Sequence, residues 1–237
     1  MWAGSIRGGL IGMKEICLYT YGNMPLNSTG GLSHKTVTSL YEDRDHILWF
    51  GTDGEGINRF DPQTGLFRHY PATFDKKVVS IIDYGEDELL LSIFSLGLYR
   101  FNKESGQLWE YNVAGIEKSR RLFRSGLAVH LDRRDEERFY IYSDSVYLYN
   151  QSAGRLETMK CEEDGVVLSA LMKAHGDQSS TYLRSSYTLL ALDHEDRSIH
   201  VFYTPPDSIG MISAVCLDKE GCFWLGTSSG LYCYDPA

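Results

Sequence analysis

The stretch 37–62, VTSLYEDRDHILWFGTDGEGINRFDP, decides the fold because it recurs later in the chain. At a shift of 175 residues it is matched by 212–227, ISAVCLDKEGCFWLGT, and after one dropped residue Asp61-Pro62 is matched by Asp235-Pro236. The two copies match over about 26 positions, and an internal repeat of this kind determines the architecture before any local assignment matters.

Weaker copies of the same unit lie before and between these two. Trp2-Ala3-Gly4-Ser5 repeats Trp49 to Thr52 at a shift of 47, and Gly97 to Asn102 repeats Gly56 to Asp61 at a shift of 41. The Asp or Asn that ends the third strand recurs at Asp61, Asn102, Asn150, Asp193 and Asp235. The spacing predicts a unit of about 44 residues, repeated along the whole chain.

Each unit contains four short strands. The segments 37–43 and 48–52 are rich in β-branched and aromatic residues and are bounded by polar turn residues. A turn of five residues that begins with Asp or Asn and ends with Gly follows the third strand at 61–65, 102–106 and 150–154. Because Asp and Asn accept backbone hydrogen bonds and Gly adopts left-handed conformations, we expect a hairpin at each of these turns.

Serial units of four strands predict an all-β fold, a β-propeller with about six blades. A β-sandwich is the alternative, but it does not explain why Trp-x-Gly-Thr recurs every four strands. We expect one propeller domain over 1–237, with blades at 1–21 (partial), 31–70, 78–111, 125–157, 166–203 and 211–237 (partial). The chain begins at a second strand and ends after a third, which predicts a fragment of a seven-bladed ring or a six-bladed ring with ragged ends.

Composition excludes several classes of protein. The 237 residues carry 23 Lys and Arg against 32 Asp and Glu, a net charge of −9, which argues against binding to nucleic acid. We also expect no membrane segment in this chain, because no apolar run approaches about 18 residues, and the N-terminus does not have the pattern of a signal peptide. Five cysteines without a CxxC motif predict core packing rather than a zinc site.

The sequence contains no catalytic or cofactor-binding motif, so we expect no enzyme activity, cofactor or metal in this chain. The seven histidines fall at different phases of the repeat and are interpreted as strand or surface residues rather than metal ligands. Trp2, Trp49 and Trp224 share one repeat position. We expect them to pack between blades, with Gly51 and Gly226 leaving room for the neighbouring sheet; stacking on a sugar is the alternative.

The run from Gly31 to Asp61 resembles the two-component regulator propeller repeat. The residues that carry the resemblance are Gly31-Leu32-Ser33, Val37 to Asp43, Leu48 to Thr52 and Gly56 to Asp61. His46 stands where the family usually has Gly in the first hairpin, and Glu55 is an extra residue before Gly56. The family builds the periplasmic sensors of hybrid two-component systems of gut Bacteroidetes, followed there by a β-sandwich, a membrane helix and a histidine kinase that are not in this chain.

In propellers, the loops that enter the innermost strand share one face with the loops between the second and third strands, and ligands tend to bind there. On this chain the entering loops are 22–36, 71–77, 112–124, 158–165 and 204–211. The residues in them that we expect to meet a polar or acidic ligand, a solvated rim being the alternative, are Asn27, His34, Lys35, Arg120, Arg121 and Arg124.

The resemblance implies a sensor that binds a glycan-derived small molecule or a partner domain, acts as a homodimer in the full receptor, and lies in the periplasm. A cytoplasmic location follows if the intact gene lacks an export signal. A propeller enzyme, such as a lyase or a metal-dependent lactonase, and a protein-interaction scaffold are the alternatives. Neither the ligand nor the closure of the ring follows from the sequence.

Overall fold

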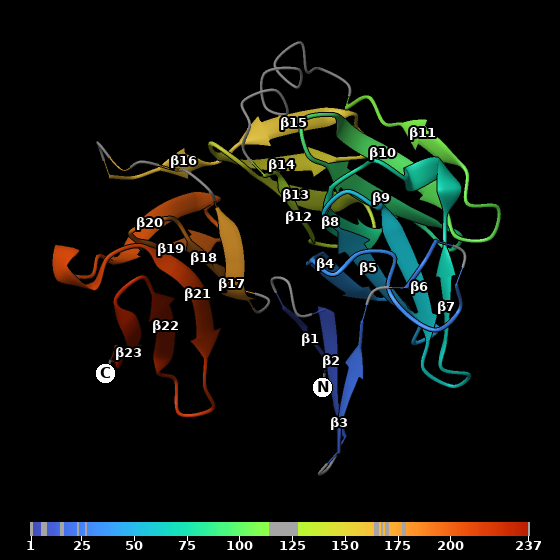
Figure 1. Ribbon diagram of the computed structural model, residues 1–237. Coiled ribbons are helices and arrows are strands. Elements are labelled where there is room, and N and C mark those ends of the chain that lie inside the picture. Colours follow the sequence, from blue (N-terminus) through green and yellow to red (C-terminus); the bar gives the residue numbers. More distant parts are fainter. Residues whose placement is uncertain are drawn as a thin grey trace. The chain divides into compact units, whose positions relative to one another are not determined.

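The computed structural model describes residues 2–236 apart from 6–8, 15–16, 23, 27, 114–127, 164–165, 167, 169–170 and 177–178, with side chains described from residue 20 onward. The described chain is built from short strands and two 3₁₀ turns, and it has the all-β propeller fold that the repeat predicts (Figure 1). It divides into two compact units, Met1–Glu136 and Glu137–Ala237.

The first unit contains three antiparallel sheets with the strand orders β1-β2-β3, β4-β5-β6-β7 and β8-β9-β10-β11, and the strand β12. The strands of this unit are β1(Trp2–Ser5), β2(Gly9–Lys14), β3(Cys17–Tyr21), β4(Val37–Glu42), β5(Leu48–Thr52), β6(Ile57–Asp61), β7(Leu66–His69), β8(Val78–Asp83), β9(Glu88–Ile93), β10(Gly97–Asn102), β11(Leu108–Glu110) and β12(His130–Arg133), with the 3₁₀ turn η1(Pro71–Thr73) before β8.

The second unit contains the antiparallel strands β13-β14-β15, a five-stranded sheet in the order β16-β20-β19-β18-β17, and the sheet β21-β22-β23. Its strands are β13(Arg138–Tyr142), β14(Val146–Asn150), β15(Arg155–Thr158), β16(Lys160–Cys161), β17(Met172–Gly176), β18(Ser180–Arg184), β19(Leu189–Asp193), β20(Ser198–Tyr203), β21(Ile212–Leu217), β22(Phe223–Thr227) and β23(Gly230–Tyr234), with the 3₁₀ turn η2(Asp207–Ile209) before β21.

The expectation of about six four-stranded blades holds only in part, because the sheets contain three to five strands: β1–β3 and β21–β23 have the three strands expected of partial blades, but one sheet has five. The fifth strand is β16, which pairs in parallel with β20 at the edge of its sheet. The four-stranded pattern holds for β4–β7 and β8–β11, whose residues match the predicted units 31–70 and 78–111.

Within the first unit, the sheet β4–β7 packs face to face on the sheet β8–β11. Trp49 is 1% exposed and lies at the centre of this core, with Tyr70 stacked at 5.8 Å and Phe101 edge-on at 5.9 Å between ring centroids. Aliphatic residues of β8 and β9 complete the cluster, and they are Val78, Ile81, Leu89, Leu91 and Ile93. The predicted packing of Trp49 between blades is therefore confirmed.

The innermost strands of these two sheets are also joined by hydrogen bonds from side-chain hydroxyls to a backbone carbonyl. The carbonyl oxygen of Val78, the first residue of β8, accepts a hydrogen bond from the Ser39 hydroxyl of β4 at 3.1 Å and another from the Thr38 hydroxyl. A Cβ atom placed on Gly51 would lie 2.3 Å from the same oxygen. Gly51 is therefore needed for the close approach of the next sheet, as the sequence predicts.

The hairpin turns between the third and fourth strands have the predicted geometry. The side-chain oxygens of Asp61, Asn102 and Asn150 accept backbone N–H bonds from Gln63 at 2.9 Å, Ser105 at 2.8 Å and Ala153 at 2.9 Å, respectively. The Gly that ends each turn is left-handed, with φ between 58° and 72° at positions 65, 106 and 154.

The first hairpin of the repeat also needs a left-handed residue. His46 has φ 59°, and Gly221, which occupies the same position 175 residues later, has φ 92°. His46 Nδ1 donates a hydrogen bond to Glu42 Oε1 at 2.6 Å, and the pair is exposed to solvent. His46 therefore adopts a left-handed conformation that Gly would adopt without steric cost.

Trp224 has different surroundings from Trp49. Both indole N–H groups donate to the Asp six residues earlier, at 2.8 Å to Asp43 and at 2.7 Å to Asp218. However, Trp224 is 40% exposed, so the prediction that it packs between blades is wrong for this chain. Among the described residues of the second unit, no other sheet covers its ring. The side chain of Trp2 lies outside the described residues.

The cysteines are less buried than predicted. Cys216 and Cys233 are exposed, whereas Cys161 is partly buried against the core of the second unit. The interpretation of Cys216 and Cys233 as core residues is wrong. Both lie on the same side of their sheet as Trp224, opposite to the side that packs in the core.

We expect Trp49→Ala to lower the free energy of unfolding by about 3 to 5 kcal/mol, because it empties a buried site between two sheets. The matched variant Trp224→Ala removes an exposed ring and should cost about 1 kcal/mol or less. Urea denaturation of both variants at low protein concentration measures the difference. Equal losses at the two positions would contradict the packing described here.

We expect His46→Gly to stabilise the protein by up to about 1 kcal/mol, since it relieves a left-handed conformation that a side chain disfavours. The gain is reduced by the greater flexibility of Gly in the unfolded chain and by loss of the contact with Glu42. Glu42→Gln is the control for that contact. A clear loss of stability on His46→Gly, with Glu42→Gln neutral, would show that the turn does not favour Gly.

Candidate ligand-binding face at the loop end

In the first unit, four loops come together at one end of the sheets β4–β7 and β8–β11. They are joined by backbone hydrogen bonds: Asp53 N–H donates to Thr36 at 3.1 Å, Gly56 N–H to Lys76 at 3.0 Å, and Phe94 N–H to Lys77 at 2.9 Å. The loop 53–56 thus contacts both loops that enter an innermost strand, and the loop 94–96 contacts the second of them, 73–77. We call this surface, formed by residues 33–36, 53–56, 73–77 and 94–96, the loop face.

An ion pair and an aromatic ring lie together on the loop face. Lys77 Nζ is 3.1 Å from Asp53 Oδ1 and 5.3 Å from the centroid of the Phe94 ring. The side chains of Lys77 and Asp53 are 37% and 42% exposed, so water and solutes reach both. An exposed pair of this kind contributes only about 0 to 1 kcal/mol to stability. Its charges therefore remain available to a ligand.

The loop that carries His34 is fixed by hydrogen bonds from buried polar side chains. The Asn58 side chain accepts a hydrogen bond from Ser33 N–H at 2.7 Å and donates to the Ser33 hydroxyl at 2.7 Å. Ser33 in turn donates to the carbonyl of Glu55 at 3.2 Å, and His69 Nε2 donates to the carbonyl of Gly31 at 2.9 Å. Because Asn58 and His69 are buried, these bonds fix the position of the loop.

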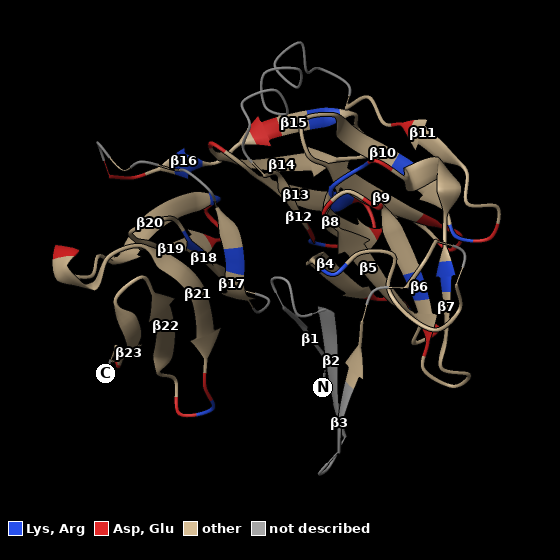
Figure 2. Ribbon diagram, viewed as in Figure 1, with Lys and Arg blue, Asp and Glu red and all other residues tan. Residues whose placement is uncertain are grey.

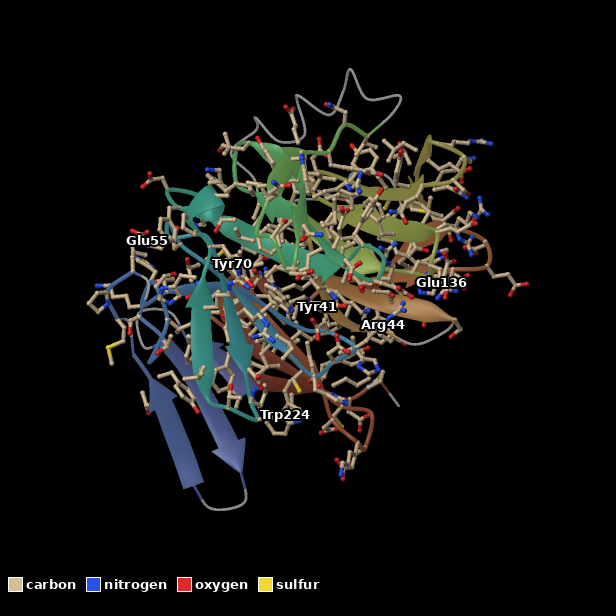
Figure 3. The ribbon with its side chains drawn as sticks, turned by 90° about the vertical axis from the view of Figure 1, so that its right-hand side faces the viewer. Tyr41, Arg44, Glu55, Tyr70, Glu136 and Trp224 are labelled. Atoms are coloured by element: carbon tan, nitrogen blue, oxygen red, sulfur yellow. The ribbon has the colours of Figure 1, made fainter. Side chains whose placement is uncertain are left out.

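The second loop pair is positioned by Thr73. Its hydroxyl donates to the Tyr70 carbonyl at 2.8 Å and accepts from Ile57 N–H at 3.0 Å. Gly56, at φ 71°, passes so close that a Cβ atom there would lie 2.1 Å from the Thr73 hydroxyl. Figure 3 labels Glu55 in this loop and Tyr41, which lies at the opposite end of the sheet β4–β7. The loop face is thus built on rigid supports.

Two of the six predicted ligand-binding residues lie on the described part of this face. His34 is half-buried and its Nδ1 accepts a hydrogen bond from Thr36 N–H at 3.1 Å, which leaves Nε2 as the protonated nitrogen of the neutral ring. Lys35 is exposed. The other four lie outside the described residues, and they are Asn27, Arg120, Arg121 and Arg124.

Sequence reasoning missed the group formed by Asp53, Lys77 and Phe94. Lys77 lies in the predicted entering loop 71–77, and Asp53 and Phe94 lie in the loops between second and third strands, but no spacing pairs either of them with Lys77. The available signal is positional, because Lys77 directly precedes β8 as Thr36 directly precedes β4, at the predicted shift of 41 residues.

The second unit has a corresponding cluster of loops. Ile212 N–H donates to Ser186 at 2.8 Å and Ser228 N–H donates to Met211 at 3.0 Å. Arg184 donates to the Ile212 carbonyl at 3.3 Å, and its burial lowers the pKa of the guanidinium from its ordinary value. This arginine therefore supports the entry to β21 rather than presenting a free charge.

The other end of the first unit carries a tyrosine in a charged environment. Burial, with Asp83 and Asp43 nearby, raises the pKa of Tyr41 to about 12. Arg44 lies 3.6 Å from Asp83, and Arg133 donates to the Asp83 backbone carbonyl. These contacts join the ends of β4, β8 and β12. Because its pKa is raised, Tyr41 stays neutral near pH 7 and is not an activated nucleophile.

A Ser, His and Asp lie together in the second unit, but not as a catalytic triad. Ser198 Oγ is 2.6 Å from His200 Nε2, and Asp196 Oδ2 is 3.9 Å from the same nitrogen. In a triad the carboxylate holds the other ring nitrogen. Asp196 instead accepts bonds from the Ser198 hydroxyl and N–H, which lower its pKa. The group belongs to the polar turn that leads into β20 and to the first residues of that strand.

Over the described ranges, no three His, Cys, Asp or Glu side chains are grouped as a metal ion would require. In the part of the chain that the structure describes, no helix is both long and apolar enough to cross a lipid bilayer.

Residues 31–54 match the family model described as "Two component regulator propeller". The chain therefore carries this repeat at the position where the sequence resemblance is most specific. No curated protein sequence is recognisably similar to the chain.

Several solved structures share the fold. The extracellular domain of the hybrid two component system BT3049 from B. thetaiotaomicron has a TM-score of 0.68 and 14% identity over 99% of this chain and 32% of that one. For the extracellular domain of BT4673 from the same organism the TM-score is 0.57, with 17% identity over 100% of this chain and 39% of that one. For an auxiliary nutrient binding protein from Bacteroides ovatus the TM-score is 0.61, with 12% identity over 99% of this chain and 66% of that one. This chain thus spans about a third of the length of each of the first two structures.

Proposed function

We propose that this chain is the ligand-sensing part of an extracytoplasmic propeller in a two-component signalling receptor, and that it binds a carbohydrate-derived molecule at the loop face. The observation that carries the proposal is the Asp53, Lys77 and Phe94 group, held on rigid loops beside a two-component regulator propeller repeat. The fold is shared with extracellular domains of two such systems.

The chemistry of the loop face suits a sugar. The Asp53 carboxylate accepts hydrogen bonds from hydroxyl groups, and the Lys77 ammonium donates to hydroxyl or carboxylate oxygens. Phe94 is half-buried and offers an apolar surface to the C–H groups of a pyranose ring. His34 and Lys35 add donors from the neighbouring loop.

Sensing requires a difference between two states. The ligand must bind one arrangement of the receptor more tightly than the other, since equal affinity for both shifts no equilibrium. In this proposal the chain belongs to one propeller domain on the periplasmic side of an inner-membrane receptor that works as a homodimer. The conversion of binding into signal lies in domains beyond this chain.

We expect hexose, uronate or sulfated oligosaccharides to bind the purified chain in calorimetric titrations, and Lys77→Met or Asp53→Asn to weaken binding at least tenfold. Both variants should keep wild-type stability, because the ion pair is exposed. The matched control is Lys219→Met, an exposed lysine in the turn between β21 and β22, which should bind normally. Unchanged affinity in both loop variants, or equal loss in the control, would contradict the proposal.

A further inference from the structure

Two cysteines are neighbours at one end of the sheet β21–β23. Trp224 of β22 pairs with Cys233 of β23, and Cys222 stands two residues before Trp224, so the three side chains share one side of the sheet. Cys222 and Cys233 are therefore diagonal neighbours on adjacent strands. Their thiols contact each other through a side-chain hydrogen bond, and both thiols are free in the structure.

The place of this pair in the repeat keeps it in contact with solvent. Cys222 directly follows the turn between β21 and β22, where Figure 2 shows charged residues, whereas the three strands carry none. At the shifts of 175 and 174 residues, Cys222 and Cys233 match Ile47 and Arg59. Both of these remain partly exposed although β8–β11 covers their side of the sheet β4–β7. This end of the sheet thus stays open to solvent whether or not another sheet packs on it.

We propose that Cys222 and Cys233 form a reversible disulfide, which makes the hairpin β22–β23 a redox-sensitive element of the propeller. The oxidant is an external disulfide, of the kind present in oxidising compartments. The thiolate of the exposed Cys233 attacks one sulfur of that disulfide and releases the other as a thiolate. The Cys222 thiolate then attacks Cys233 Sγ and releases the second external thiolate. The two protein thiols lose two protons and two electrons, and the external disulfide is reduced to two thiols.

The diagonal geometry makes the bond easy to reduce. Diagonal neighbours in an antiparallel sheet have Cα atoms about 7 to 8 Å apart, whereas a disulfide usually joins Cα atoms about 4.4 to 6.8 Å apart. Closure therefore draws the ends of β22 and β23 together, and the resulting strain favours reduction. The bond closes the loop that contains the hairpin turn, so oxidation restrains β23 against β22. The inference does not depend on the proposed ligand.

A third thiol on the same side provides a matched control. Cys216 pairs with Trp224 between β21 and β22, so it has the same diagonal offset from Cys222 on the other neighbouring strand. Its thiol instead donates to the Leu217 carbonyl at 3.7 Å. Cys216 and Cys233 lie two strand spacings apart, about 9.6 Å, which is too far for a disulfide. The contacts therefore favour the bond between Cys222 and Cys233 alone.

The closing step should depend on pH. Burial raises the pKa of Cys222 to about 11, with smaller contributions from the carboxylates of Asp218 and Asp235 and from the Cys233 thiol. Because the thiolate is the attacking species, closure should be slow at neutral pH. Below the pKa of Cys222, its rate should rise about tenfold for each pH unit.

Oxidised glutathione, added to the intact reduced chain at low protein concentration, tests the proposal when the products are mapped by mass spectrometry without reduction. We expect an internal link between Cys222 and Cys233, a loss of two hydrogen atoms, and reversal by dithiothreitol. Cys216→Ser should keep the link. Cys222→Ser and Cys233→Ser should lose it, and Cys222→Ser should retain glutathione on Cys233.

The same samples show whether the bond restrains the hairpin. Oxidation should shift the urea midpoint of unfolding upward in the wild type and in Cys216→Ser, and leave it unchanged in Cys222→Ser. Serine is close in size to cysteine, so the three variants should keep the fold, which circular dichroism checks. A link that involves Cys216, or glutathione adducts without an internal link at any pH, would each overturn the proposal.

Discussion

The structure of the first unit depends on the close contact between one innermost strand and the next. The Val78 carbonyl enters the space left by Gly51 and is bonded by the Thr38 and Ser39 hydroxyls, while Trp49 fills the region beside it. The next strand repeats part of this contact, because Ser80 matches Ser39 at a shift of 41 residues and its hydroxyl accepts from Leu131 N–H at 2.9 Å. A buried carbonyl needs such donors, so the hydroxyl residues and the glycine act together.

This contact also positions the loop face. Thr36 and Lys77 directly precede the innermost strands, and Asp53 and Phe94 directly follow the second strands, so the distance between sheets fixes the distance between loops. Lys77 reaches Asp53 and Phe94 because β8 lies against Gly51. The ligand-binding residues that we propose are therefore a consequence of blade packing, and the loops need little structure of their own.

The features that the sequence predicts are those that local chemistry determines. Asp61 and Gly65 define a turn wherever they stand, and the structure has the side-chain bond of Asp61 and the left-handed Gly65 that the sequence predicts. The exposure of Trp224 is not predictable in this way, because it depends on whether another sheet covers its ring, whereas the repeat makes Trp224 identical to Trp49. The pair Asp53 and Lys77 is likewise formed by two loops whose separation no periodicity records.

The comparison of Gly51→Ala with Gly226→Ala tests the central claim most directly, through the free energy of unfolding at low protein concentration. A methyl group at Gly51 meets the Val78 carbonyl at 2.3 Å, and overpacking of this kind costs about 1 to 3 kcal/mol. At Gly226 the same methyl group has room, and the stability should change by about 0.5 kcal/mol or less. Equal effects at the two positions would mean that no second sheet lies against Gly51, and the blade packing described here would be wrong.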